Sequence, residues 1–367
     1  MRDSSPIKGK AMKRRTSKKH APHCWLQDGA RVLFVSVTGI GNLLMLTPAL
    51  SALKSAVPDI KITALVLGSA KDVLAHNSDV DEIIPYPSDR NFLSRLRFLS
   101  KLRKNGYDAC FYAYPNVSIM SAIFLFLITG NRRVNFEYPF LWWKKCRFLN
   151  SLSVPANPAQ HDIEKNLSLI EACGIAINWK KNMQMRFNTT FEEKRVAQRL
   201  LRTRKRGETL IGFHMGANDH GKFWPTDNFI QVMERLLGHG KMRVLIVGGP
   251  QEAKLIKYFR PRHPEKTIIT IGKTSLGETA ALIRECDLFV TNDSGPMHIA
   301  VAVGTRVVGI FLSSDVRRTA PYGDEHVVFA VKKDAYSKDS NKNHIYTHKI
   351  TTDRVYRKIA ELLRLRK

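Results

Sequence analysis

The stretch 290–304 (VTNDSGPMHIAVAVG) places a carboxylate, a hydroxyl, a glycine and a histidine close together in the chain. A buried strand is predicted to lead into it, and a helix is predicted to begin after Ser294 and Gly295. The backbone amides at such a helix start can bind an anion such as a diphosphate. Asp293 would repel phosphate, so we expect it to accept hydrogen bonds from sugar hydroxyls. His298 lies one turn after Ser294 on the same helix face. The alternative is an ordinary capped helix without a ligand.

The stretch 214–225 (HMGANDHGKFWP) is a predicted strand end followed by a polar loop. Lys222 is a mobile positive charge, which suits a phosphate. His214, Asp219 and His220 are titratable groups near it in the sequence. The alternative is that Lys222 is only a solvated surface charge.

A third stretch, 247–252 (VGGPQE), follows another predicted strand. Its two glycines allow the backbone to approach a ligand closely, and Glu252 has the oxygens to accept hydrogen bonds from a ribose diol. A Gly-Gly-Pro sequence is a weak signal by itself, because it usually forms a plain turn.

These stretches belong to a regular alternation of predicted strands and helices. Short β-branched apolar runs predict buried parallel strands, and helical spacing predicts the segments between them. In the first half of the chain we predict such elements at 31–37, 42–54, 61–67 and 109–114. In the second half we predict them at 210–214, 226–237, 242–247, 267–271, 276–285, 287–291, 296–303 and 306–311. The alternation indicates parallel sheets covered by helices on both faces.

The predicted fold class is α/β, with two Rossmann-like, doubly wound domains facing a central cleft. The length of 367 residues suits two domains better than one. We assign 1–28 to a flexible basic arm, 29–182 to the first domain and 183–349 to the second. The last segment, 350–367, is predicted to be a helix that packs back on the first domain.

The chain carries a large excess of positive charge. Lys and Arg number 59 against 32 Asp and Glu, so the formal net charge is +27. The first twenty residues contribute only +7 of it. Such a charge predicts a polyanionic partner, which could be nucleic acid, an acidic membrane surface or a phosphorylated substrate. The positive charge is the only feature that supports a nucleic-acid partner. No recognition motif accompanies it, so we predict no nucleic-acid partner.

Five cysteines are scattered along the chain without a Cys-x-x-Cys pair. This pattern argues against a disulfide framework and against zinc, and it fits a reducing cytoplasm. The longest apolar run, 117–128, is shorter than the roughly 18–20 residues that a membrane span needs.

Taken together, the three stretches and the opening RVLFVSVTGIGN…TP resemble glycosyltransferase family 9, the heptosyltransferases of lipopolysaccharide core assembly. The shared features are the Lys-x-Trp-Pro loop, the Gly-Gly-x-x-Glu turn and the run Asn-Asp-Ser-Gly-Pro-Met-His, in that order, and the likeness extends from about Arg31 to Gly323. The resemblance implies a GT-B fold and an inverting transfer from a nucleotide-activated heptose, such as ADP-heptose. The second domain would hold the nucleotide sugar and the first the acceptor, a lipopolysaccharide core or related phosphorylated glycolipid.

The resemblance also implies roles for individual residues. Lys222 would contact the donor phosphate, Glu252 the ribose, and Asn218 would line the same loop. The diphosphate and sugar would be surrounded by Asp293, Ser294, Gly295 and His298. No metal or other cofactor is implied, because Lys222 and the helix-start amides can stabilise the leaving diphosphate.

The sequence departs from the family at Asn42, which follows Gly41 on the acceptor side. Familiar members have an Asp there that is thought to be the catalytic base, whereas a neutral amide cannot accept the acceptor's proton. Asn42 is expected to cap the predicted helix as well as Asp would. Three interpretations stay open: another base such as Asp219, His220 or His214; an Asn42 that only orients the acceptor while phosphate charge drives the reaction; or a catalytically silent protein that binds a nucleotide sugar or glycolipid.

Basic residues cluster in the first domain at two places. One cluster is Arg95, Arg97, Lys101, Arg103 and Lys104; the other is Arg132, Arg133, Lys144, Lys145 and Arg147, around the aromatic segment 140–143 (FLWW). Cations around exposed aromatic side chains suit an anionic membrane surface. The alternative is that Trp142 and Trp143 are core residues. We predict a cytoplasmic protein that is peripheral on the inner face of the cytoplasmic membrane.

Overall fold

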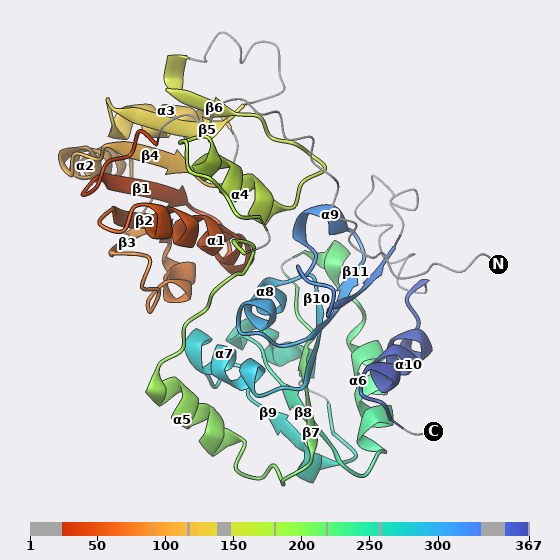
Figure 1. Cartoon of the computed structure of the whole chain (residues 1–367). Helices are drawn as coiled ribbons and strands as arrows, with labels where there is room; N and C mark the ends of the chain where they lie inside the picture. Colours follow the sequence, from red (N-terminus) through yellow and green to blue (C-terminus); the bar gives the residue numbers. More distant parts are fainter. Residues whose placement is uncertain are drawn as a thin grey trace. The chain divides into compact units, whose positions relative to one another are not determined.

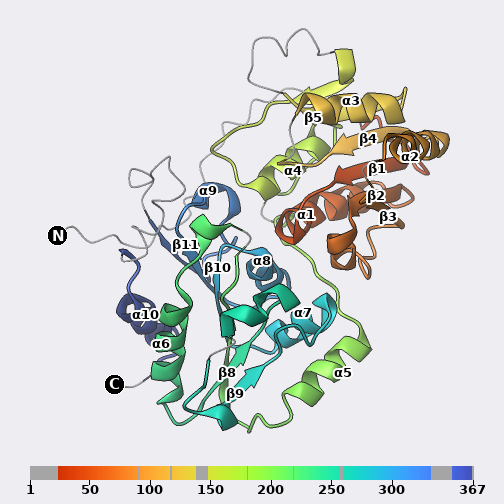
Figure 2. The ribbon, with the colours of Figure 1, turned by 180° about the vertical axis from the view of Figure 1, so that it is seen from behind.

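The computed structural model describes residues 24–89, 91–115, 118–137, 148–179, 181–217, 219–256, 259–331 and 349–365. They form two compact units, of which the first reaches to Asn188 and the second begins at Thr189. Each unit contains one six-stranded sheet (Figures 1 and 2). All strand pairs in both sheets are parallel, as the alternation of strands and helices predicted.

The sheet of the first unit has the strand order β3-β2-β1-β4-β5-β6. Its strands are β1 (Arg31–Ser36), β2 (Lys61–Leu67), β3 (Glu82–Tyr86), β4 (Ala109–Tyr112), β5 (Arg132–Phe136) and β6 (Leu152–Val154). The order reverses between β1 and β4, so ligands are expected at the carboxyl ends of these two strands.

Four helices cover the first sheet in two pairs. They are α1 (Ile40–Ala56), α2 (Phe92–Lys104), α3 (Ile119–Ile128) and α4 (Asp162–Glu171). Helix α1 packs against α4, and α2 packs against α3. Leu33 and Val35 of β1 share a buried cluster with residues of α2 and α3. Alternate residues of a strand point to opposite faces and crossovers are right-handed, so α1 and α4 cover the other face.

Helix α1 begins earlier than predicted and is not capped by Asn42. Its N-cap is Gly39, which has no side chain to cap with, and Asn42 lies inside the first turn. The prediction that Asn42 caps this helix was therefore wrong. Further along, Pro48 has no amide hydrogen for the carbonyl of Leu44, and the hydroxyl of Thr47 donates to that carbonyl at 2.8 Å instead. The helix therefore continues to Ala56 without leaving this buried carbonyl unpaired.

The sheet of the second unit has the order β12-β11-β10-β7-β8-β9. Its strands are β7 (Thr209–His214), β8 (Met242–Ile246), β9 (Thr267–Ile269), β10 (Leu288–Asn292), β11 (Val307–Phe311) and β12 (Val327–Ala330). Its helices are α5 (Phe191–Leu200), α6 (Thr226–Leu237), α7 (Leu276–Arg284), α8 (Gly295–Ala302), α9 (Val316–Thr319) and α10 (Thr352–Leu362). The order reverses between β7 and β10.

The C-terminal helix α10 packs on α6 within the second unit, not on the first domain as we expected. Its apolar side chains Val355 and Ile359 are fully buried in the core of this unit. The indole Nε1 of Trp224 donates to the carbonyl of Ile350, 2.9 Å away, just before α10 begins. The apolar stripe of α10 is thus covered by the core beside β7 and α6.

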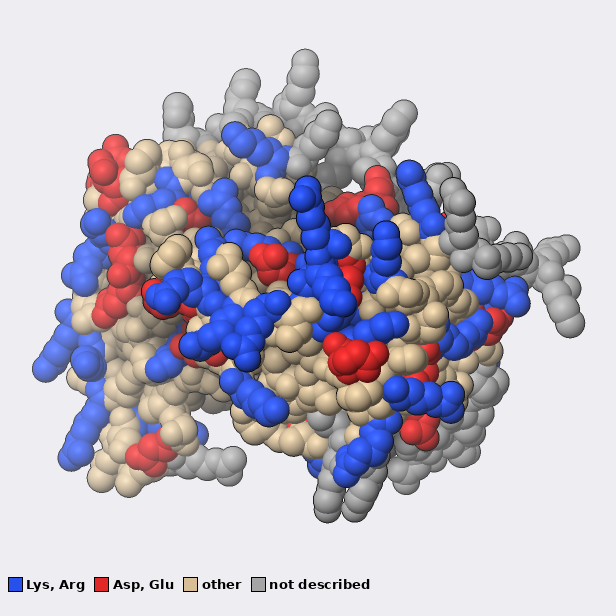
Figure 3. Space-filling model, turned by 90° about the horizontal axis from the view of Figure 1, so that it is seen from below, with Lys and Arg blue, Asp and Glu red and all other residues tan. Residues whose placement is uncertain are grey.

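Lys and Arg side chains are spread over the face of the molecule shown in Figure 3, where Asp and Glu form smaller groups. The net charge of +27 is therefore carried by folded surface as well as by the N-terminal segment. Among the helices that the structure describes, none is long and apolar enough to cross a membrane.

Candidate active site

The three predicted motifs of the second unit meet at the point where its strand order reverses. Strands β7 and β10 are neighbours, β8 lies beside β7, and β11 lies beside β10. The carboxyl ends of parallel strands lie at one edge of a sheet, so the loops that follow these four strands converge there. Those loops contain the residues predicted to bind a nucleotide sugar.

Lys222 and Asp293 form an ion pair at the centre of this edge. The Nζ of Lys222 lies 2.6 Å from Oδ2 of Asp293, and the hydroxyl of Ser314 donates to the same oxygen. Asp293 is 5% exposed, whereas the side chain of Lys222 is 32% exposed. A lysine ammonium has three hydrogens, so two remain for a phosphate beside the pair. We expected Asp293 to bind sugar hydroxyls; in this structure it holds the ammonium in place.

Asn292 and Trp224 fix the loop that carries Lys222. The buried amide of Asn292 donates to the carbonyl of Met215 at 2.8 Å, and its oxygen accepts the backbone amide of Trp224 at 3.1 Å. Trp224 itself is fully buried. The Trp of the Lys-x-Trp-Pro motif is thus an anchor for Lys222. No role was predicted for Asn292, although its place beside Asp293 at a strand end was a usable signal.

His214 connects the ribose candidate Glu252 to the start of α8. Its Nε2 lies 2.9 Å from Oε1 of Glu252, and its Nδ1 lies 3.1 Å from the hydroxyl of Ser294. The imidazole is 2% exposed. Both ring nitrogens are thus engaged inside the protein, which does not favour His214 as the base. Its position indicates that it orients Glu252.

The carboxylate of Glu252 packs closely against the backbone of Gly216 and Gly248. A Cβ at Gly216 would lie 1.9 Å from its Oε1, and a Cβ at Gly248 would lie 2.6 Å from its Oε2. The amide of Gly249 donates to this carboxylate as well. Burial by itself raises the pKa of Glu252, but the hydrogen bond and charge of His214 and the Gly249 amide outweigh it, so the pKa is lowered. Glu252 is thereby kept as an anion that accepts hydrogen bonds.

Helix α8 starts at Gly295, one residue before the predicted start, and its cap also differs from the prediction. Ser294 occupies the N-cap position without a capping hydrogen bond from its side chain. Its hydroxyl is instead near His214 and 3.2 Å from the hydroxyl of Thr291. Gly295 is the first helical residue, and Pro296 next to it has no amide hydrogen. His298 is buried on the same helix, 4% exposed.

Asn218 lies outside the described residues, as does the aromatic segment with Trp142 and Trp143. His220 belongs to the short turn that ends at Lys222, and the structure describes its backbone only. Asp219 is exposed, and its Oδ1 accepts the amide of Gly221 at 2.9 Å. In the described part of the chain no three His, Cys, Asp or Glu side chains are grouped so that they could hold a metal ion.

The acceptor-side candidates Gly41 and Asn42 belong to the first unit, in the first turn of α1. This turn follows the carboxyl end of β1, where the order of the first sheet reverses. The side chain of Asn42 is half-buried and, among the described residues, has no hydrogen-bond partner. Its amide is therefore free to bind a ligand.

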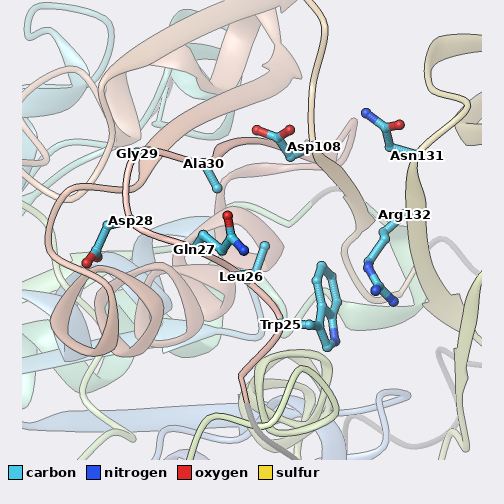
Figure 4. A pocket seen from close by; sticks show the side chains of 9 residues that line it. All are labelled: Trp25, Leu26, Gln27, Asp28, Gly29, Ala30, Asp108, Asn131 and Arg132. Atoms are coloured by element: carbon cyan, nitrogen blue, oxygen red, sulfur yellow. The ribbon is translucent and has the colours of Figure 1, made fainter.

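A hollow of about 420 Å³ lies elsewhere on the first unit (Figure 4). Ala30, Asp108 and Asn131, which line it, precede β1, β4 and β5, so it is at the amino ends of the strands. The guanidinium of Arg132 lies 4.6 Å from the ring centre of Trp25 on its wall. Ligands of open α/β sheets bind at the opposite edge, so we do not assign the hollow to the reaction.

Residues 95–349, more than half of the chain, match the sequence profile of glycosyltransferase family 9 (heptosyltransferase). The chain belongs to glycosyltransferase family 9. As a member of this family it is a glycosyltransferase, as the sequence motifs predicted. Its Lys222, Glu252 and Asp293 lie within the matched segment, whereas Asn42 precedes it.

Individual relatives agree with the family assignment. Lipopolysaccharide heptosyltransferase 3 of Escherichia coli K12 is 25% identical over 303 residues, which are 79% of this chain and 84% of the relative. The structure of a family 9 glycosyl transferase from Veillonella parvula has a TM-score of 0.74 at 22% identity and covers 92% of this chain and 97% of its own. E. coli heptosyltransferase WaaC, solved with ADP, has a TM-score of 0.68 at 19% identity, covering 90% and 99%. These similarities confirm the GT-B fold for this family 9 enzyme.

Proposed function

We propose that this enzyme transfers a heptose-like sugar from ADP-heptose to lipopolysaccharide core or a related phosphorylated glycolipid. Its family, the relative in E. coli K12 that is named for lipopolysaccharide heptosyl transfer, and the ADP bound in the structure of WaaC support this proposal. The observation that carries it is the Lys222–Asp293 pair beside the start of α8.

On the donor side, negative charge accumulates on the diphosphate as its bond to the anomeric carbon breaks. This charge is stabilised by the two spare hydrogens of the Lys222 ammonium and by the positive end of the α8 dipole. Glu252, oriented by His214, accepts hydrogen bonds from the ribose hydroxyls. These groups supply the electrostatic stabilisation of the leaving group, and we propose that the enzyme has no resident metal.

On the acceptor side, a hydroxyl oxygen attacks the anomeric carbon from the face opposite the diphosphate, which inverts the configuration. The amide of Asn42 orients this hydroxyl but does not take its proton. Asp219 and His220, on the loop of Lys222, are the candidates for the base; a developing phosphate charge is the alternative. Full activity in both Asp219→Asn and His220→Ala would exclude these two residues.

A lipid-linked acceptor and a water-soluble donor meet at a membrane surface. We therefore propose that the enzyme acts on the inner face of the cytoplasmic membrane as a peripheral protein. The excess of Lys and Arg supports this location, because such residues are attracted to anionic lipid.

The test is release of ADP from ADP-heptose in the presence of purified acceptor. We expect turnover by the wild type and a fall in kcat of about 10²–10³ in Lys222→Met, because one preorganised donor to the leaving group is lost. Lys194→Met, on the exposed face of α5, is the matched control and should retain turnover. ADP binding without any ADP release would favour the silent binding protein instead.

A further inference from the structure

Helices α2 and α3 lie side by side on one face of the first sheet (Figures 1 and 2). The inner stripe of α2, formed by Phe98, Leu99 and Leu102, packs into the core beneath it. Nη1 of Arg103, near the end of α2, donates to the carbonyl of Leu127 at the end of α3, 3.2 Å away. The two helices therefore present one joined outer face to solvent.

This outer face carries large apolar side chains that nothing in the described structure covers. In the first turns of the two helices, Phe92 is 70% exposed and Met120 is 66% exposed. The remaining exposed apolar residues of this face are Leu93, Leu96, Phe126 and Leu127. Single exposed apolar residues are ordinary, but a group of six on two adjacent helices indicates an interaction surface.

The charge on the same face has one sign. Helix α2 carries five Lys or Arg residues and no Asp or Glu, and α3 carries no charged residue at all. The guanidinium of Arg133 lies 5.2 Å from the ring centre of Phe126, so a cation accompanies the apolar residues at the far end of α3 too. Cations interleaved with exposed Phe, Leu and Met side chains complement an anionic lipid surface.

Two other occupants fit this face less well. A second copy of the chain would bring five cations of α2 against five like charges. Nucleic acid would pair with the cations but would leave the six apolar side chains without a partner. Charge is also not what distinguishes this face, because Lys and Arg are abundant on the face in Figure 3 as well.

The position of the face connects it to the acceptor side of the first unit. A helix in a β-α-β unit begins beside the carboxyl end of the preceding strand, so Phe92 and Met120 lie toward the carboxyl edge of the sheet. Asn42 follows the carboxyl end of β1 at the same edge. A bilayer against α2 and α3 would thus be near the edge of the sheet where the first turn of α1, which we assign to a lipid-linked acceptor, begins.

We propose that the outer face of α2 and α3 docks on an anionic lipid bilayer. The choice of a membrane rests on the proposed glycolipid acceptor, but the surface itself is argued from exposure and charge. The side chains of Phe92, Leu93 and Met120 enter the headgroup region, and the cations of α2 contact lipid phosphates.

The experiment compares two triple variants of the full-length protein. The test variant alters α2 by Phe92→Ser, Arg95→Gln and Arg97→Gln. The control variant makes the matching changes on α5, whose first residue is likewise an exposed Phe. These changes are Phe191→Ser, Lys194→Gln and Arg199→Gln. Each protein is floated with vesicles of phosphatidylglycerol and phosphatidylethanolamine, and with vesicles of phosphatidylcholine alone. Circular dichroism checks folding, and ADP release with a deacylated, water-soluble acceptor checks the reaction.

We expect the α2 variant to bind the anionic vesicles at least about thirtyfold more weakly, since each cation near the surface contributes about fivefold. The α5 variant should float like the wild type, and phosphatidylcholine should bind all three weakly. Turnover of the soluble acceptor should be equal in all three proteins. If none of the three proteins releases ADP with the soluble acceptor, the proposed reaction is contradicted. The flotation result then still tests whether the α2–α3 face binds the membrane.

Equal flotation of the α2 and α5 variants would overturn the proposal. So would a wild-type dimer that becomes monomeric in the α2 variant, because a second copy would then cover the face. Wild-type binding to duplex DNA without binding to anionic vesicles would assign the surface to nucleic acid instead.

Discussion

Asn42 occupies the third position of α1, where a carboxylate would be favoured. An Asp in the first turn of a helix interacts with the positive end of the helix dipole, so Asn42→Asp should raise the free energy of unfolding by about 0.3–1 kcal/mol. The new carboxylate also accepts a proton, which the amide does not. We therefore expect kcat of ADP release to rise.

Urea unfolding and steady-state kinetics at neutral pH measure both effects. Asn91→Asp, at the N-cap of α2 in the same unit, controls for the added charge at a helix start. A more stable Asn42→Asp protein with unchanged kcat would show that this position does not face the reacting hydroxyl.

The lowered pKa of Glu252 predicts how acid affects stability. A group whose pKa is depressed in the folded state contributes stability that is complete above its ordinary value of 4.5 and is lost as the pH falls through the lower folded value. Glu252→Gln lacks this contribution at every pH. The stability difference between wild type and variant should therefore be largest near neutral pH and shrink below about pH 4.5.

Urea unfolding at a series of pH values measures this difference. Glu192→Gln on the exposed face of α5 removes the same charge at a surface ion pair and should give a smaller difference. A difference for Glu252→Gln that grows on acidification would contradict the role of His214 and the Gly249 amide in holding the carboxylate.

Gly216, in the turn after β7, leaves room for the side chain of Glu252, which comes from the loop after β8. In Gly216→Ala the new Cβ would displace Oε1 of Glu252, the flexible end of its side chain, while the backbone could stay in place. We expect a lower Tm, because the contact of Oε1 with His214 is lost, and ADP binding that is about ten- to a hundredfold weaker, because a hydrogen bond to a charged group is lost.

Isothermal titration with ADP and thermal unfolding measure the two effects separately. Gly240→Ala is the matched control, because a Cβ there meets nothing within 4 Å. Normal ADP affinity in Gly216→Ala would contradict the assignment of Glu252 to the ribose.

Element bounds in the second unit were predictable, and contacts between elements were not. The predicted helix 226–237 is α6 to the residue, since its apolar spacing and the preceding Trp-Pro pair mark both ends. Contacts such as Ser314 with Asp293, or Trp224 with Ile350, join segments that are distant in the chain. They depend on strand order, which periodicity does not encode. Helix α2 was missed because its exposed Phe92 and Leu93 blur the helical pattern.

At the scale of the whole molecule, the donor-side and acceptor-side motifs are divided between the units. Every described residue that we assign to the donor lies in the unit that begins at Thr189, and Gly41 and Asn42 lie in the other. The sequence predicted this division, because the donor motifs all follow strands of the second half. It did not predict that α10 would complete the core of the donor unit, since an amphipathic helix fits any apolar groove.

This division predicts how ADP affects thermal unfolding. A ligand stabilises only the part of the protein that it binds, by about 2.7 kcal/mol at a concentration 100 times its Kd. Calorimetry of the full chain with ADP should therefore raise the midpoint temperature of one transition, that of the donor unit, by about 5–11 °C and leave the other in place. Fluorescence of Trp224, the one Trp among the described residues of the donor unit, identifies that transition in a variant in which the other four Trp residues are replaced by Phe.

Lys222→Met should reduce the shift, because its phosphate contact is lost. Equal shifts of both transitions would mean that ADP contacts both units, and the donor site would then have to include residues of the first.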